Sequence, residues 1–184
     1  MGVPILCILN IGHSRKDPGC INRNYNVTEF EFNHQLALDI ESALEKTSVS
    51  CMLVYQDTYS GLATLINGFD PDFVLSLHAN SFDTKVRGCE VLYYWETTLD
   101  GGESLVLADM AQKNLNSALH NPNRGVLPRT ADNRGGKLLR DVNAPIVLCE
   151  PFFLDNDVDY QNAINNYDIL VAAYVKTIVQ YSER

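Results

Sequence analysis

Short apolar runs alternate with amphipathic segments along most of this chain, and that alternation limits the folds open to it. The apolar runs have the length of strands and are bounded by turn-forming or polar residues. Strands that alternate with helices form a mostly parallel sheet with helices packed on both faces, a three-layer α/β domain. We expect the strands at residues 3–11, 49–55, 73–78, 89–95 and 146–149.

The first amphipathic segment predicts a helix over residues 28–46. Apolar residues recur at every fourth position from Phe32 to Leu44, which gives the helix one apolar face. Thr28 followed three residues later by Glu31 is the pattern of a capping box, which marks the start of a helix. Further helices are expected at residues 61–66, 103–119, 157–165 and 167–181.

Two details complete the expected arrangement. In the helix over residues 103–119, four residues are expected to face inward: Leu105, Ala108, Leu115 and Leu119. Residues 126–141 are rich in Arg, Gly and Asn, which predicts a loop on the functional side of the sheet with at most a short strand.

The bulk properties favour one globular domain over residues 1–184, without a linker to a second module. The 184 residues are 46% hydrophobic and 20% charged, as in ordinary folded proteins. Lys and Arg number 14 against 23 for Asp and Glu, a net charge of −9. So acidic a chain has no basic surface for nucleic acid, and it is not attracted to anionic membranes. No apolar run is long enough to span a bilayer.

The compartment is predicted from the N-terminus and the cysteines. No basic residue precedes the first apolar run and no cleavage pattern follows it, so we expect no signal peptide and synthesis in a bacterial cytoplasm. The cysteines number five, and four of them lie within apolar, strand-like runs, which is typical of reduced, buried thiols. We expect a monomer.

Side chains able to bind metal follow three of the predicted strands. His13 comes after the first strand, His78 ends the third, and Glu150 follows the last. In such sheets functional residues gather beyond the carboxyl ends of the strands. Glu29 opens the first helix, and with Glu31 turned back to the cap it is free to point toward His13. Two imidazoles and one carboxylate are a common ligand set for catalytic zinc, and a second carboxylate could serve as a general base.

Simpler interpretations exist for several of these residues. A lone histidine at a strand end is often structural, and Glu29 could merely complement the helix dipole. Glu150 is harder to explain in that way, because an unpaired acid among apolar residues is costly. Cys20 in the loop after His13 is an alternative metal ligand, although the three-ligand set is complete without it.

Two more residues are candidates for binding substrate. Asn80 could order the site or simply close a strand into a turn. Arg140 has the fork geometry to bind a carboxylate, but it could equally form a surface ion pair with Asp141.

Several segments together resemble one enzyme family, the zinc-dependent N-acetylmuramoyl-L-alanine amidases of the amidase-3 type. The similarity runs in order over nearly the whole chain, and its most specific parts are the His-Ala-Asn strand end and the apolar strand ending in glutamate. The matching segments are Ile11-Gly12-His13, Thr28-Glu29 with Asn33, Ser76 to Asn80, Gly88 to Tyr94, Leu139-Arg140, Ala144 to Glu150, and Phe153 to Asn156. One segment departs from the family: Asp17-Pro18-Gly19 follows the first histidine, whereas the family usually has Asp-Pro-Gly before it.

The resemblance implies a six-stranded twisted sheet, zinc held by His13, Glu29 and His78, and Glu150 as general base. It implies hydrolysis of the amide between N-acetylmuramic acid and L-alanine of peptidoglycan. The one-domain form and the segment around Glu150 are similar to bacteriophage endolysin catalytic domains, without a separate wall-binding domain. Two alternatives remain open: a non-catalytic peptidoglycan-binding module and a zinc carboxypeptidase.

Overall fold

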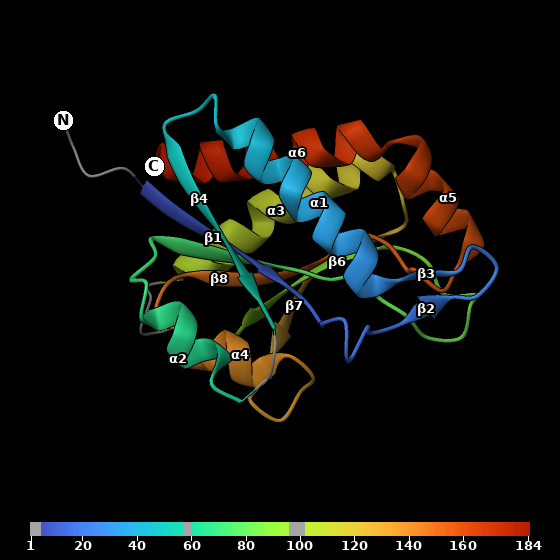
Figure 1. The fold of residues 1–184 in the computed structure, drawn as a ribbon, viewed down its shortest axis with the longest axis horizontal. Helices are drawn as coiled ribbons and strands as arrows, with labels where there is room; N and C mark the ends of the chain where they lie inside the picture. The colour runs from blue at the N-terminus through green and yellow to red at the C-terminus, as the bar shows by residue number, and fades with distance from the viewer. Residues whose placement is uncertain (1–4, 57–59, 96–101) are drawn as a thin grey trace.

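The apolar runs form the strands of a six-stranded sheet in the order β4-β1-β5-β8-β6-β7 (Figure 1). The computed structural model describes residues 5–56, 60–95 and 102–184, so the first two residues of the predicted 3–11 strand lie outside the described part. The strands are β1 (Ile5–Ile11), β4 (Val49–Tyr55), β5 (Phe73–Leu77), β6 (Cys89–Tyr94), β7 (Asn123–Arg129) and β8 (Ile146–Glu150). The predicted strands are therefore confirmed within one or two residues.

The direction of each strand determines which residues lie at the same edge of the sheet. β1 pairs in parallel with β4 and β5, β5 with β8, and β6 with β7, whereas β6 and β8 are antiparallel. The mostly parallel sheet expected from the sequence is confirmed. Because β6 runs against β8, the start of β6 lies beside the end of β8, and Glu90 is the register partner of Glu150.

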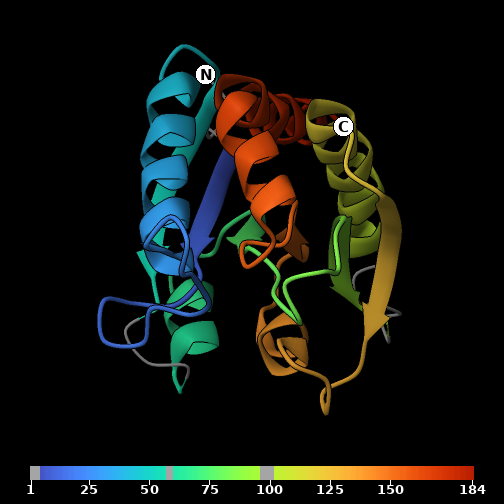
Figure 2. The ribbon, with the colours of Figure 1, turned by 90° about the vertical axis from the view of Figure 1, so that its right-hand side faces the viewer.

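Helices cover both faces of the sheet and make three layers (Figures 1 and 2). One face carries α1 (Glu29–Leu44), α3 (Glu103–Leu119), α5 (Asp157–Asn165) and α6 (Tyr167–Ser182). On the other face, the described part of the chain places the short helices α2 (Leu62–Asn67) and α4 (Gly136–Asp141). Within the described ranges, no helix has both the length and the apolar character needed to cross a membrane.

The central strands β1, β5 and β8 are almost continuously apolar because both of their faces are buried. In β1, Cys7, Leu9 and Ile11 pack into the core under the four larger helices, while Ile8 packs into the second core under α2 and α4. Alternate residues of a strand point to opposite faces, so a strand covered on both sides has no polar face. This explains why the alternating hydrophobic pattern of an exposed sheet is absent.

The start of α1 follows the predicted capping box. The Glu31 amide donates to the Thr28 hydroxyl, and the Thr28 amide donates to the Glu31 carboxylate. A two-stranded hairpin that the sequence did not predict, β2 (Ile21–Asn22) with β3 (Val27–Thr28), leads into this helix. The prediction that Leu105 faces inward is wrong: it is 37% exposed, and the buried residues around it in α3 are Ser104, Leu107 and Ala108.

The interpretation of residues 126–141 as mainly loop needs a correction, because β7 and α4 lie largely within this segment. No residue of β7 is fully buried, so the strand lacks the apolar pattern by which strands are recognised. Pro128 also argues against a central strand, and β7 is indeed at the edge of the sheet.

Candidate active site

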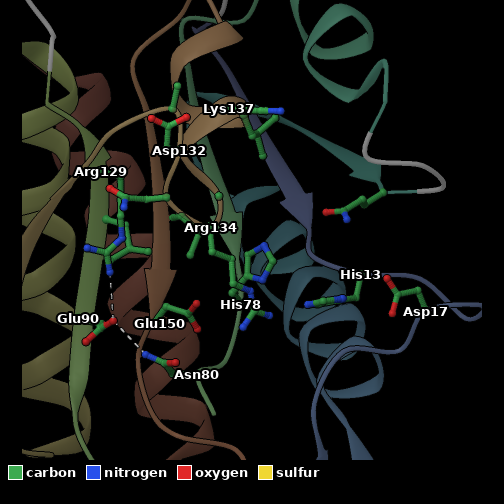
Figure 3. Close-up of a pocket in the computed structure, with 17 residues that line it drawn as sticks. His13, Asp17, His78, Asn80, Glu90, Arg129, Asp132, Arg134, Lys137 and Glu150 are labelled. Atoms are coloured by element: carbon green, nitrogen blue, oxygen red, sulfur yellow. Dashed lines mark hydrogen bonds and ion pairs between the residues drawn. The ribbon is translucent and has the colours of Figure 1, made fainter. Parts of the chain in front are cut away.

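Three adjacent strands bring the predicted side chains to one edge of the sheet. β1, β5 and β8 are neighbours in the sheet order, and His13, His78 and Glu150 lie at or just beyond their carboxyl ends. Figure 3 shows the three side chains around one cavity. The three side chains that the sequence singled out thus lie together at the edge where functional residues gather in such sheets.

The close approach of β1 and β5 requires a glycine beside His78. In the parallel register Ile11 pairs with Leu77, so Gly12 stands next to His78, and its amide donates to the Leu77 carbonyl at 3.0 Å. A methyl group on Gly12 would lie 2.4 Å from Cε1 of His78. The imidazole therefore packs directly against Gly12, just after β1, and any larger residue at this position would collide with it.

Glu29 links the two histidines. Its Oε1 lies 2.9 Å from Nδ1 of His78, and its Oε2 lies 3.2 Å from Nε2 of His13. The amides of Cys20 and Ala79 also donate to this carboxylate, which is only 1% exposed. The capping box turns Glu31 back and leaves Glu29 directed into the site, as the sequence predicted.

The loop after β1 closes against this cluster. His13 has a φ of 67°, a left-handed conformation that is uncommon for a residue with a side chain and that often marks functional sites. Gly19 has a φ of 76°, and a methyl group there would lie 2.6 Å from Oε2 of Glu29 and 2.7 Å from the His13 ring. The Asp17-Pro18-Gly19 segment, which follows His13 in this sequence instead of preceding it, thus packs against the cluster through Gly19.

The three side chains can together hold a metal ion. One ligand atom from each of His13, Glu29 and His78 lies within 4.8 Å of the others. Both ring nitrogens of His13 are buried and have no well-aligned hydrogen-bond partner among the described residues, a deficit that coordination would remove. The sulfur of Cys20 lies 3.5 Å from the Ala79 carbonyl instead, and within the described part of the chain it is not in the cluster.

The charges of Glu29 and the two imidazoles influence one another. Burial opposes ionisation of Glu29, but the adjacent imidazoles of His13 and His78 outweigh it, so the pKa of this carboxyl lies well below its usual range. The same carboxylate raises the pKa of His13. The cluster thus presents an ionised acid between two imidazoles.

Glu150 behaves in the opposite way. Burial first, and then the negative charge of Glu29, raise the pKa of this carboxyl well above its usual value, while the positive charge of Arg134 opposes the rise. Its Oε2 is buried without a hydrogen-bond partner in the described residues. An acid of raised pKa in a cleft is a candidate for proton transfer.

A cavity of about 640 Å³ opens over this edge, on the face of the sheet that α4 covers only in part. The volume is in the range of small-molecule sites. The cavity is lined by His13, Asp17, Gln56, His78, Asn80, Glu90, Leu92, Arg129, Ala131, Asp132, Asn133, Arg134, Gly135, Lys137, Leu138, Leu148 and Glu150.

Glu90 anchors one wall of the cavity. It is 4% exposed, it pairs with Arg124, and its Oε1 lies 3.8 Å from Arg129. Asn80 donates from its side-chain amide to Glu90 at 3.0 Å (Figure 3). Asn80 therefore lines the cavity, and its side-chain oxygen also accepts a hydrogen bond from the Ser81 amide in the segment that follows β5.

Arg140 does not join the other predicted residues. It is outside the cavity lining, and its guanidinium makes two contacts with the Asp141 carboxylate, at 2.6 and 3.1 Å. The ion pair, one of the two roles expected for it, is the role seen. The basic residues that do line the cavity are Arg129, Arg134 and Lys137, and sequence reasoning missed all three. The signal was the Arg- and Gly-rich composition of their segment, which indicated the correct side of the sheet but no individual residue.

Known proteins share both the sequence pattern and the fold. An uncharacterised cell wall amidase of Bacillus anthracis is 36% identical over 94 residues, which is 48% of this chain and 16% of that relative, so the chain spans only a small part of its length. An N-acetylmuramoyl-L-alanine amidase from Clostridium difficile 630 superposes with a TM-score of 0.82 at 25% identity, over 97% of each chain.

The catalytic domain of an endolysin targeting Clostridium difficile has the same fold, with a TM-score of 0.77 at 20% identity over 96% of this chain and 97% of that one. The family description N-acetylmuramoyl-L-alanine amidase matches residues 7–180, nearly the whole chain. The chain therefore belongs to the N-acetylmuramoyl-L-alanine amidase family.

Proposed function

We propose that this protein hydrolyses the amide bond between N-acetylmuramic acid and the L-alanine of the peptidoglycan stem peptide, with zinc as its metal. The observation that carries the proposal is the convergence of His13, Glu29 and His78 in one corner of a cavity that also contains Glu150. A metal-binding corner and an acid of raised pKa are the two elements that metal-assisted amide hydrolysis requires.

Zinc fits the donor set. Two imidazole nitrogens and one carboxylate are its common catalytic ligands, whereas calcium and magnesium prefer oxygen donors alone. Zinc at such a site polarises a carbonyl oxygen and makes water more acidic. The protein orients its ligands through Glu29, which is held by the Cys20 and Ala79 amides.

Glu150 moves the proton in this proposal. The carboxylate takes a proton from the attacking water at its unpartnered Oε2 and passes it to the nitrogen that leaves. The lactyl group of the sugar then ends as a carboxylate, and the stem peptide leaves with a free amino terminus. A raised pKa suits a group that must first accept a proton and then release it.

The substrate contacts follow from the cavity walls. We assign Asn80 to the substrate-facing wall, since it lines the cavity beside Glu90. A contact from Arg140 would require the peptide to extend beyond the cavity along α4, where Arg140 pairs with Asp141. We further propose a lytic, endolysin-like role on the bacterial wall, which the similar segment around Glu150 and the shared fold of an endolysin catalytic domain support.

The test is digestion of purified peptidoglycan by the zinc-loaded protein, beside Glu150→Gln and a chelated sample. We expect the wild type alone to release intact stem peptides and leave glycan chains without them. Release of single amino acids would indicate a carboxypeptidase, and binding without any release would indicate a wall-binding module. Release by the chelated, metal-free protein at the same rate would overturn the metal mechanism.

A further inference from the structure

The wall of the cavity formed by the end of β7, the following loop and α4 carries three basic side chains against one acidic side chain, Asp132. Arg129, Arg134 and Lys137 all line it, although the chain as a whole has a net charge of −9. Fixed charges that line a cleft attract ligands of opposite sign more strongly than charges on an open surface. The wall therefore favours a ligand with negative charge.

The three cations differ in whether their charge is already neutralised. Arg129 lies 3.8 Å from Glu90, which also pairs with Arg124. The charge of Arg129 is therefore already compensated by an acid of the cavity wall. Within the described ranges, no carboxylate lies within 4.0 Å of the Arg134 guanidinium or the Lys137 amine. Of these two cations, only the Arg134 guanidinium has the planar fork that matches a carboxylate with two hydrogen bonds. The acids that share the cavity lining at its exposed positions, Asp17 and Asp132, are thus not ion-paired with Arg134.

A hydrogen-bonded turn holds Arg134 at the cavity. The Thr130 amide donates to the Asn133 side chain at 2.8 Å, the Asn133 amide donates to the Thr130 carbonyl at 3.0 Å, and the Gly136 amide donates to the Asn133 carbonyl at 2.9 Å. The turn leads directly into α4. In the view of Figure 3, Arg134 lies above His78 and Glu150, between these residues and the loop.

We propose that Arg134 binds a free carboxylate of the stem peptide and makes the enzyme prefer carboxylate-bearing stem peptides over amidated ones. This inference rests on the proposed function, because it places the scissile amide at His13, Glu29 and His78. The peptide then extends from the cleaved bond toward α4. A guanidinium binds a carboxylate with two parallel hydrogen bonds, and a neutral carboxamide cannot reproduce that pairing.

The carboxylate nearest to the cleaved bond belongs to the second residue of the stem. In peptidoglycan this residue is linked through its side-chain carboxyl, so its α-carboxyl is either free or converted to an amide. Bacterial walls therefore differ in whether this carboxylate is available to Arg134. Arg134 would act as a specificity-determining residue, separate from the residues that bind metal or move protons.

The experiment measures binding without turnover. Zinc-loaded Glu150→Gln protein is titrated calorimetrically with two muramyl tripeptides that differ only in a carboxylate or carboxamide on the second residue. We expect tighter binding of the carboxylate ligand by about 10- to 100-fold, the range for hydrogen bonds to a charged group. Adding Arg134→Gln should remove that difference and leave binding of the carboxamide within about twofold, because only the charge-assisted pairing is lost.

Arg140→Gln is the matched control, since it removes the same charge from the neighbouring helix at a residue outside the cavity lining. It should leave the preference unchanged. Equal affinity for the two ligands, or a preference that survives Arg134→Gln, would overturn the inference. Failure of the proposed function gives a different result: a protein that discriminates between the two ligands in binding, while the wild type releases no stem peptide, contradicts the hydrolysis alone.

Discussion

Glu90 and Glu150 are register partners across the antiparallel pair of β6 and β8, and both carboxylates line the same cavity. Their surroundings differ. Glu90 is paired with Arg124 and accepts a hydrogen bond from Asn80, whereas Oε2 of Glu150 has no partner in the described residues. Of these two neighbouring acids, Glu90 is thus held by its partners in the cavity wall, whereas the pKa of Glu150 is raised.

Replacing Glu150 by Gln should remove turnover while leaving the metal in place. The amide keeps the shape of the side chain but cannot accept the proton from water, so kcat should fall by about 10²- to 10⁴-fold. Zinc content, measured by elemental analysis after dialysis, should equal that of the wild type because Glu150 is outside the His13, Glu29 and His78 cluster. A variant that retains normal turnover would exclude Glu150 as the base.

The same substitution should change how the stability of the metal-free protein depends on pH. The pKa of Glu150 is raised in the folded state above its usual value of 4.5, chiefly by burial and then by Glu29. The folded state therefore holds this proton more tightly than the unfolded chain and loses stability as pH rises above that value. Between the pKa of the unfolded chain and that of the folded protein, the free energy of unfolding falls by about 1.4 kcal/mol for each pH unit.

Denaturant unfolding in a chelator, from pH 5 to pH 9, should show Glu150→Gln gaining stability relative to the wild type as pH rises. The contributions of His13 and Glu29 are present in both proteins and do not produce this difference. Parallel curves for the two proteins would mean that Glu150 titrates normally in the folded state.

Removing the charge of Glu90 should affect both stability and the pH profile. Glu90→Gln leaves Arg124 and Arg129 without their acid, which should lower the free energy of unfolding by about 1–3 kcal/mol. Loss of this negative charge should also lower the pKa of Glu150, so the acidic limb of the rate profile should move to lower pH.

Glu103→Gln provides the comparison for Glu90, because Glu103 forms an exposed pair with Arg184. Exposed pairs contribute about 0–1 kcal/mol, and Glu103 is outside the cavity lining. An equal loss of stability in both variants, with no shift of the pH profile for Glu90→Gln, would contradict the anchoring role.

Gly12→Ala should weaken metal binding without touching a ligand. The new methyl group would lie 2.4 Å from Cε1 of His78, so the imidazole must move from its place beside Glu29. Zinc affinity, measured by competition with a chromophoric chelator, should fall by about 10- to 100-fold, as for other supports of metal ligands. Gly68→Ala, at the end of α2 with a φ of −65°, should leave zinc affinity unchanged. Normal affinity in Gly12→Ala would show that His78 can shift freely.

The sequence predicts those parts of this protein whose patterns are local. The capping box determines both the start of α1 and the direction of Glu29. The buried strands are recognisable from their apolar runs, and each of β1, β5 and β8 directly precedes or contains a site residue. These elements account for the residues that the sequence singled out at the metal cluster.

What depends on pairing between distant segments could not be predicted in the same way. The opposite direction of β6 and β8 brings Glu90 beside Glu150, but nothing near Glu90 in the sequence indicates that neighbour. The edge strand β7 has no buried apolar face to reveal it. Arg134 and Arg140 are similarly placed around one short helix, and only the three-dimensional fold distinguishes the one at the cavity.

The order of the site residues along the chain has a consequence for how such a protein can diverge. His13, Glu29 and His78 all belong to the first half of the chain, around β1, α1 and β5, while Glu150 and Arg134 come from the second half. With the roles proposed above, mutations that accumulate in the second half can change substrate choice, or abolish hydrolysis altogether, and still leave a metal-binding scaffold for selection to reuse.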